Sequence, residues 1–127
     1  MKVLVVDDSR AIRGIISKHL VALGFEVLEA SGGVEALTQL KHLGRDDLVL
    51  LDWNMPEMNG FDVLRRIRTE REYDELRVMM VTTESEMNQV ARALDAGANE
   101  YLMKPFNREA LVEKLVLLGI DLGEAAA

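Results

Sequence analysis

The sequence predicts an α/β fold: a five-stranded parallel sheet, doubly wound, with helices on both faces. Short apolar runs recur along the chain, and the segments between them carry apolar residues at helical spacing. Four of these runs are followed by polar side chains, which are Asp7-Asp8, Asp52, Thr82 and Lys104. Because parallel strands bring their carboxyl ends to one edge of a sheet, we expect these side chains to meet there.

The composition limits the classes of function. The 127 residues, 49% of them hydrophobic, suffice for one domain with a core. The net charge of -7 repels phosphate backbones, so nucleic-acid binding is not expected. The sequence has no apolar run of the roughly 18 residues that span a membrane and no signal-peptide pattern, so we expect no membrane insertion and a cytoplasmic location. Cysteine is absent, and His19 and His42 are interpreted as helix-surface residues without a metal role.

The first half of the chain contains three predicted strands and two predicted helices. A strand over residues 2–6 precedes a helix that ends at Gly24, a residue type that favours helix C-termini. The apolar stripe of this helix consists of Ile12, Ile15, Ile16, Leu20 and Leu23. A strand over residues 25–30, a turn at Gly32-Gly33 and a helix ending at Gly44 follow. The stripe of this second helix consists of Val34, Leu37, Leu40 and Leu43. The third strand begins at Asp47.

The second half continues the alternation. After a loop over residues 53–60, a third helix is predicted with inward residues Phe61, Leu64 and Ile67. The charged stretch 68–75 is interpreted as solvated surface before a strand over residues 78–81. A fourth helix ends at Gly97 and is marked by Met87, Val90, Ala91, Leu94 and Ala98. A last strand, 101–103, leads to a helix with Asn107 as N-cap and an inner stripe of Leu111, Leu115 and Leu118.

The three carboxylates predicted at the sheet edge require a cation. Two carboxylates 4 Å apart repel by about 4 kcal/mol at an effective dielectric constant near 20. A hard divalent ion with oxygen ligands, such as Mg²⁺, fits this set. In the alternative, Asp7 or Asp8 is simply the N-cap of the first helix, which leaves the other acids unexplained. Taken alone, Asp52 is also compatible with a turn residue, and Lys104-Pro105 with a surface turn.

Together, these residues resemble the receiver domain of two-component response regulators. The resemblance covers essentially the whole chain, with the motifs in family order and spacing. The motifs are Val5-Val6-Asp7-Asp8-Ser9, Asp52-Trp53-Asn54-Met55-Pro56, Val81-Thr82 and Lys104-Pro105-Phe106. CheY-type chemotaxis regulators are the most similar, also through Tyr101. The resemblance implies a flavodoxin-like (βα)5 receiver domain over residues 1–119, strand order 2-1-3-4-5, and a tail over residues 120–127.

The resemblance also implies a role for each site residue. Asp52 is the expected phosphoacceptor, and Lys104 neutralises charge on the phosphoryl group, aided by a cis Lys104-Pro105 bond. Asp8 and Asp52 are expected to bind Mg²⁺ directly, Asp7 through water, and Asn54 through its backbone carbonyl.

A further set of residues is expected to switch the domain and to set its rates. Thr82 and Tyr101 form the expected switch, although a strand-end threonine and a half-buried tyrosine without that role fit the sequence as well. Asn54, Thr83 and Glu84 are expected to tune the phosphorylation and dephosphorylation rates. Thr83 is bulkier than the alanine or glycine frequent in the family, and we expect it to narrow access to Asp52.

The expected partners are a sensor histidine kinase or histidine phosphotransfer protein, and an output protein. The output face would comprise the fourth helix, the last strand and the last helix, with Met87, Arg92, Tyr101, Met103 and Lys114 exposed. Regulators that bind the flagellar switch usually carry lysines where this chain has Glu86 and Met87, which predicts weaker attraction for an acidic peptide. A monomer is expected.

The sequence leaves several functions open. The favoured one is a stand-alone phosphoacceptor that signals by phosphorylation-dependent binding. Chemotaxis is favoured as its pathway, and a phosphorelay or a phosphate sink is the alternative. A phosphatase of the aspartyl-phosphate type uses similar carboxylates, but the connections are too short to provide a lid over a small substrate. A receiver-like module that is never phosphorylated is the third alternative.

Overall fold

The computed structural model describes residues 1–123, except for the side chain of Glu84. One parallel sheet has the strand order β2-β1-β3-β4-β5, which confirms the predicted fold class. The strands are β1 (Lys2–Val6), β2 (Glu26–Ala30), β3 (Leu48–Asp52), β4 (Arg77–Thr82) and β5 (Glu100–Met103). The helices are α1 (Arg10–Ala22), α2 (Gly33–Gln39), α3 (Gly60–Arg68), α4 (Val90–Asp95) and α5 (Arg108–Leu117). Short 3-10 helices are η1 (Leu40–His42), η2 (Arg71–Tyr73) and η3 (Glu84–Gln89).

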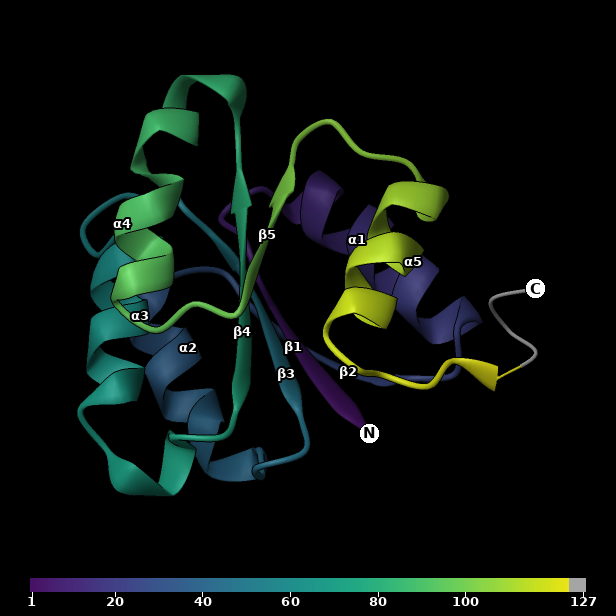
Figure 1. Ribbon diagram of the computed structural model, residues 1–127, viewed down its shortest axis with the longest axis horizontal. Coiled ribbons are helices and arrows are strands. Elements are labelled where there is room, and N and C mark those ends of the chain that lie inside the picture. Colours follow the sequence, from purple (N-terminus) through teal and green to yellow (C-terminus); the bar gives the residue numbers. More distant parts are fainter. Residues whose placement is uncertain (124–127) are drawn as a thin grey trace.

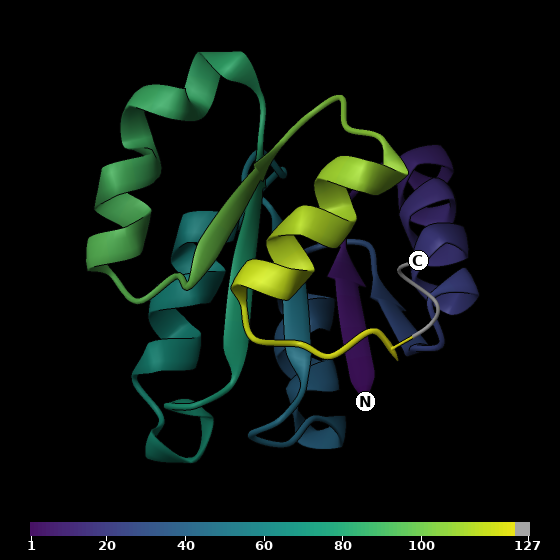
Figure 2. The ribbon, with the colours of Figure 1, turned by 45° about the vertical axis from the view of Figure 1, so that its right-hand side comes forward.

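Helices cover both faces of the sheet. The helices α1 and α5 lie on one face, and α2, α3 and α4 on the other (Figures 1 and 2). Successive strand residues point to opposite faces, so Val3 and Val5 pack toward α1 and α5 while Leu4 and Val6 pack toward the other layer. Every residue of β3 is buried because this central strand is covered on both sides. This explains why its sequence is continuously apolar until Asp52.

The first helix does not have an aspartate as its N-cap. Ser9 is its N-cap, and the Ser9 hydroxyl accepts a hydrogen bond from the backbone N–H of Ile12 at 3.3 Å. The interpretation of Asp7 or Asp8 as the cap is therefore wrong, which leaves both acids available to the sheet edge. The helix ends before Gly24, whose φ of 95° is the left-handed conformation expected there. Ile12 is 38% exposed and belongs only partly to the predicted inner stripe.

The predicted inner faces are also wrong at Ile15, Val34, Ala91 and Leu94, which are exposed. The buried residues of α2 and α4 include Ala36 and Ala93, which were not predicted, together with Val90, which was. Small residues let a short helix pack close to the sheet, and apolar residues on both sides of these helices leave periodicity ambiguous.

Three further predictions, on the start of the fourth helix, the start of the third strand and the charged stretch 68–75, differ from the structure. Residues 84–89 form the 3-10 helix η3, whereas the pattern predicts that Met87 already belongs to the fourth α-helix. Asp47 precedes β3 instead of beginning it, because its carboxylate accepts hydrogen bonds from the backbone N–H groups of Lys2 and Gly44. The charged stretch 68–75 is not simply solvated surface: Tyr73 is 9% exposed, and the Arg68 guanidinium is hydrogen-bonded to backbone carbonyls.

Other predictions at the helices are confirmed. Phe61, Leu64 and Ile67 are buried on α3. Asn107 is the N-cap of α5 and accepts a hydrogen bond from the Ala110 N–H at 2.9 Å. The inner stripe of α5 is buried at Leu111 and Leu115 and partly buried at Leu118, and Gly97 follows α4 with a φ of 113°. His19 lies partly buried on α1 and His42 exposed on η1. Within residues 1–123, no helix has the length and apolar character needed to cross a bilayer.

A strained turn follows β3. Glu57 has a φ of 68°, and the Met58 N–H donates to the Pro56 carbonyl at 2.8 Å. Because asparagine tolerates positive φ better than glutamate, Glu57→Asn should raise the free energy of unfolding by about 0.5–1 kcal/mol. Urea denaturation measures this change. Glu57→Gln keeps the strain and serves as the control, so equal stability of the two variants would contradict the prediction.

Candidate functional site

The polar residues predicted at the strand ends do converge. Asp7 and Asp8 follow β1, Asp52 is the last residue of β3, Thr82 is the last residue of β4, and Lys104 follows β5. The five strands are parallel and in register, so all of these residues lie at the carboxyl edge of the sheet. The site is thus positioned by the sheet itself, with one contribution from each of four strands.

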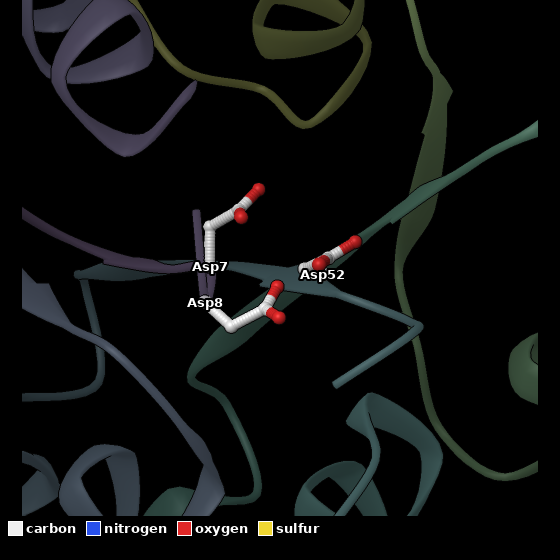
Figure 3. A group of neighbouring side chains, drawn as sticks. All are labelled: Asp7, Asp8 and Asp52. Atoms are coloured by element: carbon white, nitrogen blue, oxygen red, sulfur yellow. The ribbon is translucent and has the colours of Figure 1, made fainter. Parts of the chain in front are cut away.

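Three carboxylates gather at this edge. Asp7, Asp8 and Asp52 each offer an oxygen, and these oxygens all lie within 4.8 Å of one another (Figure 3). Asp7 and Asp52 are 1% and 6% exposed, whereas Asp8 is exposed to solvent. The donor set contains only oxygen, which suits a hard divalent cation such as Mg²⁺ better than a soft metal. The exposed Asp8 leaves one side open, as an ion that retains several waters requires.

Lys104 bridges two of the acids. Its Nζ lies 2.8 Å from Asp7 Oδ2 and 3.1 Å from Asp52 Oδ1, and all three side chains are largely buried. Burial alone would lower the pKa of Lys104, but the hydrogen bonds and charges of Asp7 and Asp52 outweigh burial and raise it. The lysine therefore stays cationic and neutralises part of the cluster. The Lys104-Pro105 bond is cis, as expected.

The environment of Asp52 makes its carboxyl group a weaker acid than usual. Burial, the largest cause, raises its pKa from 3.8 to about 6, although the positive charge of Lys104 acts in the opposite direction. The negative charges of Asp7 and Asp8 raise the pKa further. Without a metal ion, Asp52 is mostly ionised above about pH 6. The negative charge of the three carboxylates then attracts a cation to the site.

This shift predicts a pH dependence of stability in magnesium-free solution. Between pH 3.8 and about 6 the unfolded chain has released the Asp52 proton that the folded protein still holds. The Asp52 contribution to the free energy of unfolding should therefore fall as the pH rises through this window. Urea denaturation of wild type and Asp52→Asn at several pH values tests this expectation. If the two stability curves run parallel from pH 4 to 7, the prediction is wrong.

Gly60 fixes the loop that follows Asp52. A Cβ atom at Gly60 would lie 2.2 Å from the backbone oxygen of Asp52, and the Gly60 N–H donates to the Trp53 carbonyl at 2.9 Å. No side chain fits at this position, so the start of α3 is held against the end of β3. Asn54 lies exposed in the loop between them. The sequence reasoning did not identify Gly60, although a glycine at a helix start was a visible signal.

Thr82 has an unexpected hydrogen-bond partner. Its side chain is completely buried, and its hydroxyl donates to Met87 Sδ in η3 at 3.7 Å. Tyr101 is partly buried, and Lys114 Nζ lies 4.1 Å from its ring centroid while also pairing with Glu100 at 3.1 Å. The role of Met87 was not foreseen, because a thioether acceptor leaves no periodic signal in a sequence.

Thr83 is hydrogen-bonded to Glu86 at the start of η3. Its backbone N–H donates to the Glu86 carboxylate at 3.1 Å, which is the Glu86 half of a capping box, and its hydroxyl makes a separate hydrogen bond to the same carboxylate. The side chain of Thr83 is exposed, and its expected effect on access to Asp52 stays a prediction. The Glu84 side chain, the third predicted rate-tuning group, lies outside the described part of the structure.

Behind the site, an aromatic stack connects the Asp52 loop to α4. Trp53 is 6% exposed and stacks on Phe61 with ring centroids 5.6 Å apart. The Arg92 guanidinium from α4 lies 4.5 Å from the Phe61 ring centroid. The single tryptophan of the chain is therefore packed next to Asp52 and is connected through Phe61 to Arg92 of α4, so its fluorescence should respond to changes in either place.

The sequence matches the family described as response regulator receiver domain over residues 3–116. A chemotaxis protein CheY homolog of Campylobacter jejuni is 46% identical, with 100% of this chain and 99% of that protein covered. Chemotaxis protein CheY1 of Helicobacter pylori is 47% identical, with 95% and 99% covered. Among solved structures, chemotaxis response regulator CheY4 of Vibrio cholerae superimposes with a TM-score of 0.84 at 38% identity, covering 92% of this chain and 97% of that chain.

Proposed function

This chain belongs to the response regulator receiver family, and from that premise we propose that it accepts a phosphoryl group on Asp52 and signals by a change in protein binding. The observation that carries the proposal is the pairing of Asp52 with Lys104 at 3.1 Å inside a cluster of three acids. A carboxylate held beside a buried ammonium group can attack phosphorus while the ammonium compensates charge on the phosphoryl oxygens.

In the proposed reaction, an Asp52 oxygen forms a bond to phosphorus as the bond from phosphorus to the donor histidine nitrogen breaks. Asp52 has to be ionised to attack, and a pKa of about 6 leaves it mostly ionised near neutral pH. Lys104 contacts Asp52 in the resting protein and is within reach of the new phosphoryl oxygens. Asp7 holds the Lys104 ammonium from the other side, at 2.8 Å, so Asp7 orients the lysine.

Mg²⁺ is the cofactor that fits the acid cluster. Asp8 and Asp52 would bind the ion directly, Asp7 through water, and the backbone carbonyl of Asn54 would add a ligand. When bound, the ion would neutralise carboxylate repulsion and charge on the transferred group. The oxygen-only donor set and the solvent-exposed Asp8 support this assignment.

The phosphoryl donor would be a sensor histidine kinase or a histidine phosphotransfer protein. The output partner would bind the face formed by α4, β5 and α5, where Arg92 and Met103 are exposed and Met87, Tyr101 and Lys114 are partly buried. Thr82 and Tyr101 would connect this face to the site. The relatives' names favour chemotaxis over a phosphorelay or a phosphate sink.

A fluorescence titration tests the phosphoacceptor assignment. Beryllofluoride mimics a phosphoryl group on a carboxylate, and Trp53 directly follows Asp52. We expect Mg²⁺ and then beryllofluoride to change Trp53 emission in wild type, and Asp52→Asn to lose the beryllofluoride response. A wild-type protein that is folded but insensitive to both ligands would leave a receiver-shaped module without phosphorylation.

Turnover separates a receiver from a phosphatase. A receiver should release phosphate from acetyl phosphate slowly and leave phosphomonoesters nearly untouched. A phosphatase of the aspartyl-phosphate class should give on the order of one or more turnovers per second on such esters. Fast phosphomonoester hydrolysis that Asp52→Asn abolishes would favour the enzyme.

A further inference from the structure

The hydroxyl of Thr82 is held by an unusually weak partner. Thr82 is 0% exposed, so bulk solvent does not reach its hydroxyl group. Within the described residues, the hydrogen bond of this hydroxyl goes to Met87 Sδ, at 3.7 Å, and not to an oxygen of the acid cluster. A thioether sulfur is a weak acceptor, and a buried hydroxyl bound to it is easily recruited by a stronger one. An anionic phosphoryl oxygen is a much stronger acceptor.

The position of Met87 is set by the local structure of η3. The segment begins with the capping box between Thr83 and Glu86, so the chain turns sharply directly after Thr82. At the other end, the Met87 carbonyl accepts a hydrogen bond from the N–H of Val90, whose side chain is 8% exposed and anchors α4. The short 3-10 helix is thus fixed at both ends. Met87 lies within it, and its sulfur faces the end of β4.

We propose that Met87 is a positioning residue that holds the Thr82 hydroxyl in its resting orientation and thereby sets how readily the protein reaches its phosphorylated conformation. This inference rests on the proposed function of Asp52 and Thr82. Binding of a phosphoryl group draws the hydroxyl toward Asp52 and breaks the hydrogen bond to sulfur. Because Met87 lies in η3, this exchange also removes one of the contacts that hold the segment leading into α4, which belongs to the proposed output face.

Two substitutions of similar size test this role in opposite directions. Met87→Leu removes the acceptor and should tighten beryllofluoride binding in the presence of Mg²⁺ about two- to fivefold, the equivalent of one weak hydrogen bond. Met87→Gln supplies a stronger carbonyl acceptor and should weaken binding by a similar factor. The titration follows Trp53 fluorescence, and circular dichroism verifies that each variant is folded. A role in packing alone would not produce shifts of opposite sign.

The same two variants in a Thr82→Val background complete the test. Valine keeps the shape of threonine without the hydroxyl, so both Met87 substitutions should then leave beryllofluoride affinity unchanged. Shifts that persist in this background, shifts of the same sign in both variants, or no shift at all would overturn the role of Met87. The proposed function is tested separately, by the loss of the wild-type response in Asp52→Asn.

Discussion

Replacing Lys104 by methionine is expected to slow phosphorylation of Asp52 by acetyl phosphate about 100- to 1000-fold, the usual loss when a preorganised charge-stabilising donor is removed. Lys104 lies between Asp7 and Asp52, at 2.8 and 3.1 Å, and no other cation forms an ion pair with these acids in the described part of the chain. Methionine keeps much of the volume and removes the charge. Single-turnover phosphorylation at saturating Mg²⁺ measures the rate.

The pH dependence of the same variant gives a second readout. Lys104 lowers the pKa of Asp52 through its charge and its hydrogen bond, so its loss should raise that pKa in magnesium-free solution. A titration without Mg²⁺ should then show the Asp52 carboxyl group losing its proton at a higher pH than in wild type. Lys41→Met is the matched control, since Lys41 is exposed on η1, and it should react at the wild-type rate. A folded Lys104→Met protein with a rate within about threefold of wild type would contradict the proposed mechanism.

The ends of the strands could be predicted because they depend on local signals. A continuous apolar run that ends in a polar residue marks a strand covered on both faces, and the parallel arrangement then brings these residues together. By this reasoning Asp7 and Lys104 meet although they lie 97 positions apart in the sequence. The strand order came from the family resemblance, since the apolar runs alone do not distinguish which strands are neighbours.

The parts that could not be predicted depend on individual side-chain partners. Ser9, and not an aspartate, caps α1, although both residue types suit that position. Val34 is exposed and Ala93 buried, because α2 and α4 are short and carry apolar residues on more than one side. The hydrogen bond from Thr82 to Met87 depends on the 3-10 geometry of η3, which has no distinct hydrophobic period.

Arg68 is the clearest case of a residue whose role its sequence context concealed, and its loss should strongly reduce the stability of the fold. We expect Arg68→Met to lower the free energy of unfolding by about 2–4 kcal/mol, since hydrogen bonds from a charged group contribute roughly 1.5–3 kcal/mol each and are partly offset by desolvation. Its guanidinium donates to the backbone carbonyls of Tyr73 at 2.6 Å, Leu76 at 2.8 Å and Gly97 at 3.0 Å. Urea denaturation measures the loss.

These bonds connect three parts of the chain. Arg68 ends α3, Tyr73 and Leu76 belong to the turn before β4, and Gly97 belongs to the turn between α4 and β5. The guanidinium also donates to Asn99 Oδ1 at 3.0 Å, and that oxygen accepts the N–H of Val78 at 2.8 Å. Burial, the main cause, lowers the pKa of Arg68, and this desolvation is the cost that the hydrogen bonds offset.

Two further variants separate the geometry of Arg68 from its charge. Arg68→Lys keeps the positive charge but cannot reach three carbonyls with one ammonium group, so it should recover less than half of the lost stability. Arg66→Met is the control, because Arg66 is exposed on the same helix and should change the free energy of unfolding by less than about 0.5 kcal/mol. If Arg68→Met is no more destabilising than Arg66→Met, the hydrogen bonds of Arg68 do not stabilise the packing of α3 against the turns on either side of β4. If Arg68→Lys is as stable as wild type, the positive charge alone provides the stabilisation and the planar guanidinium geometry is not required.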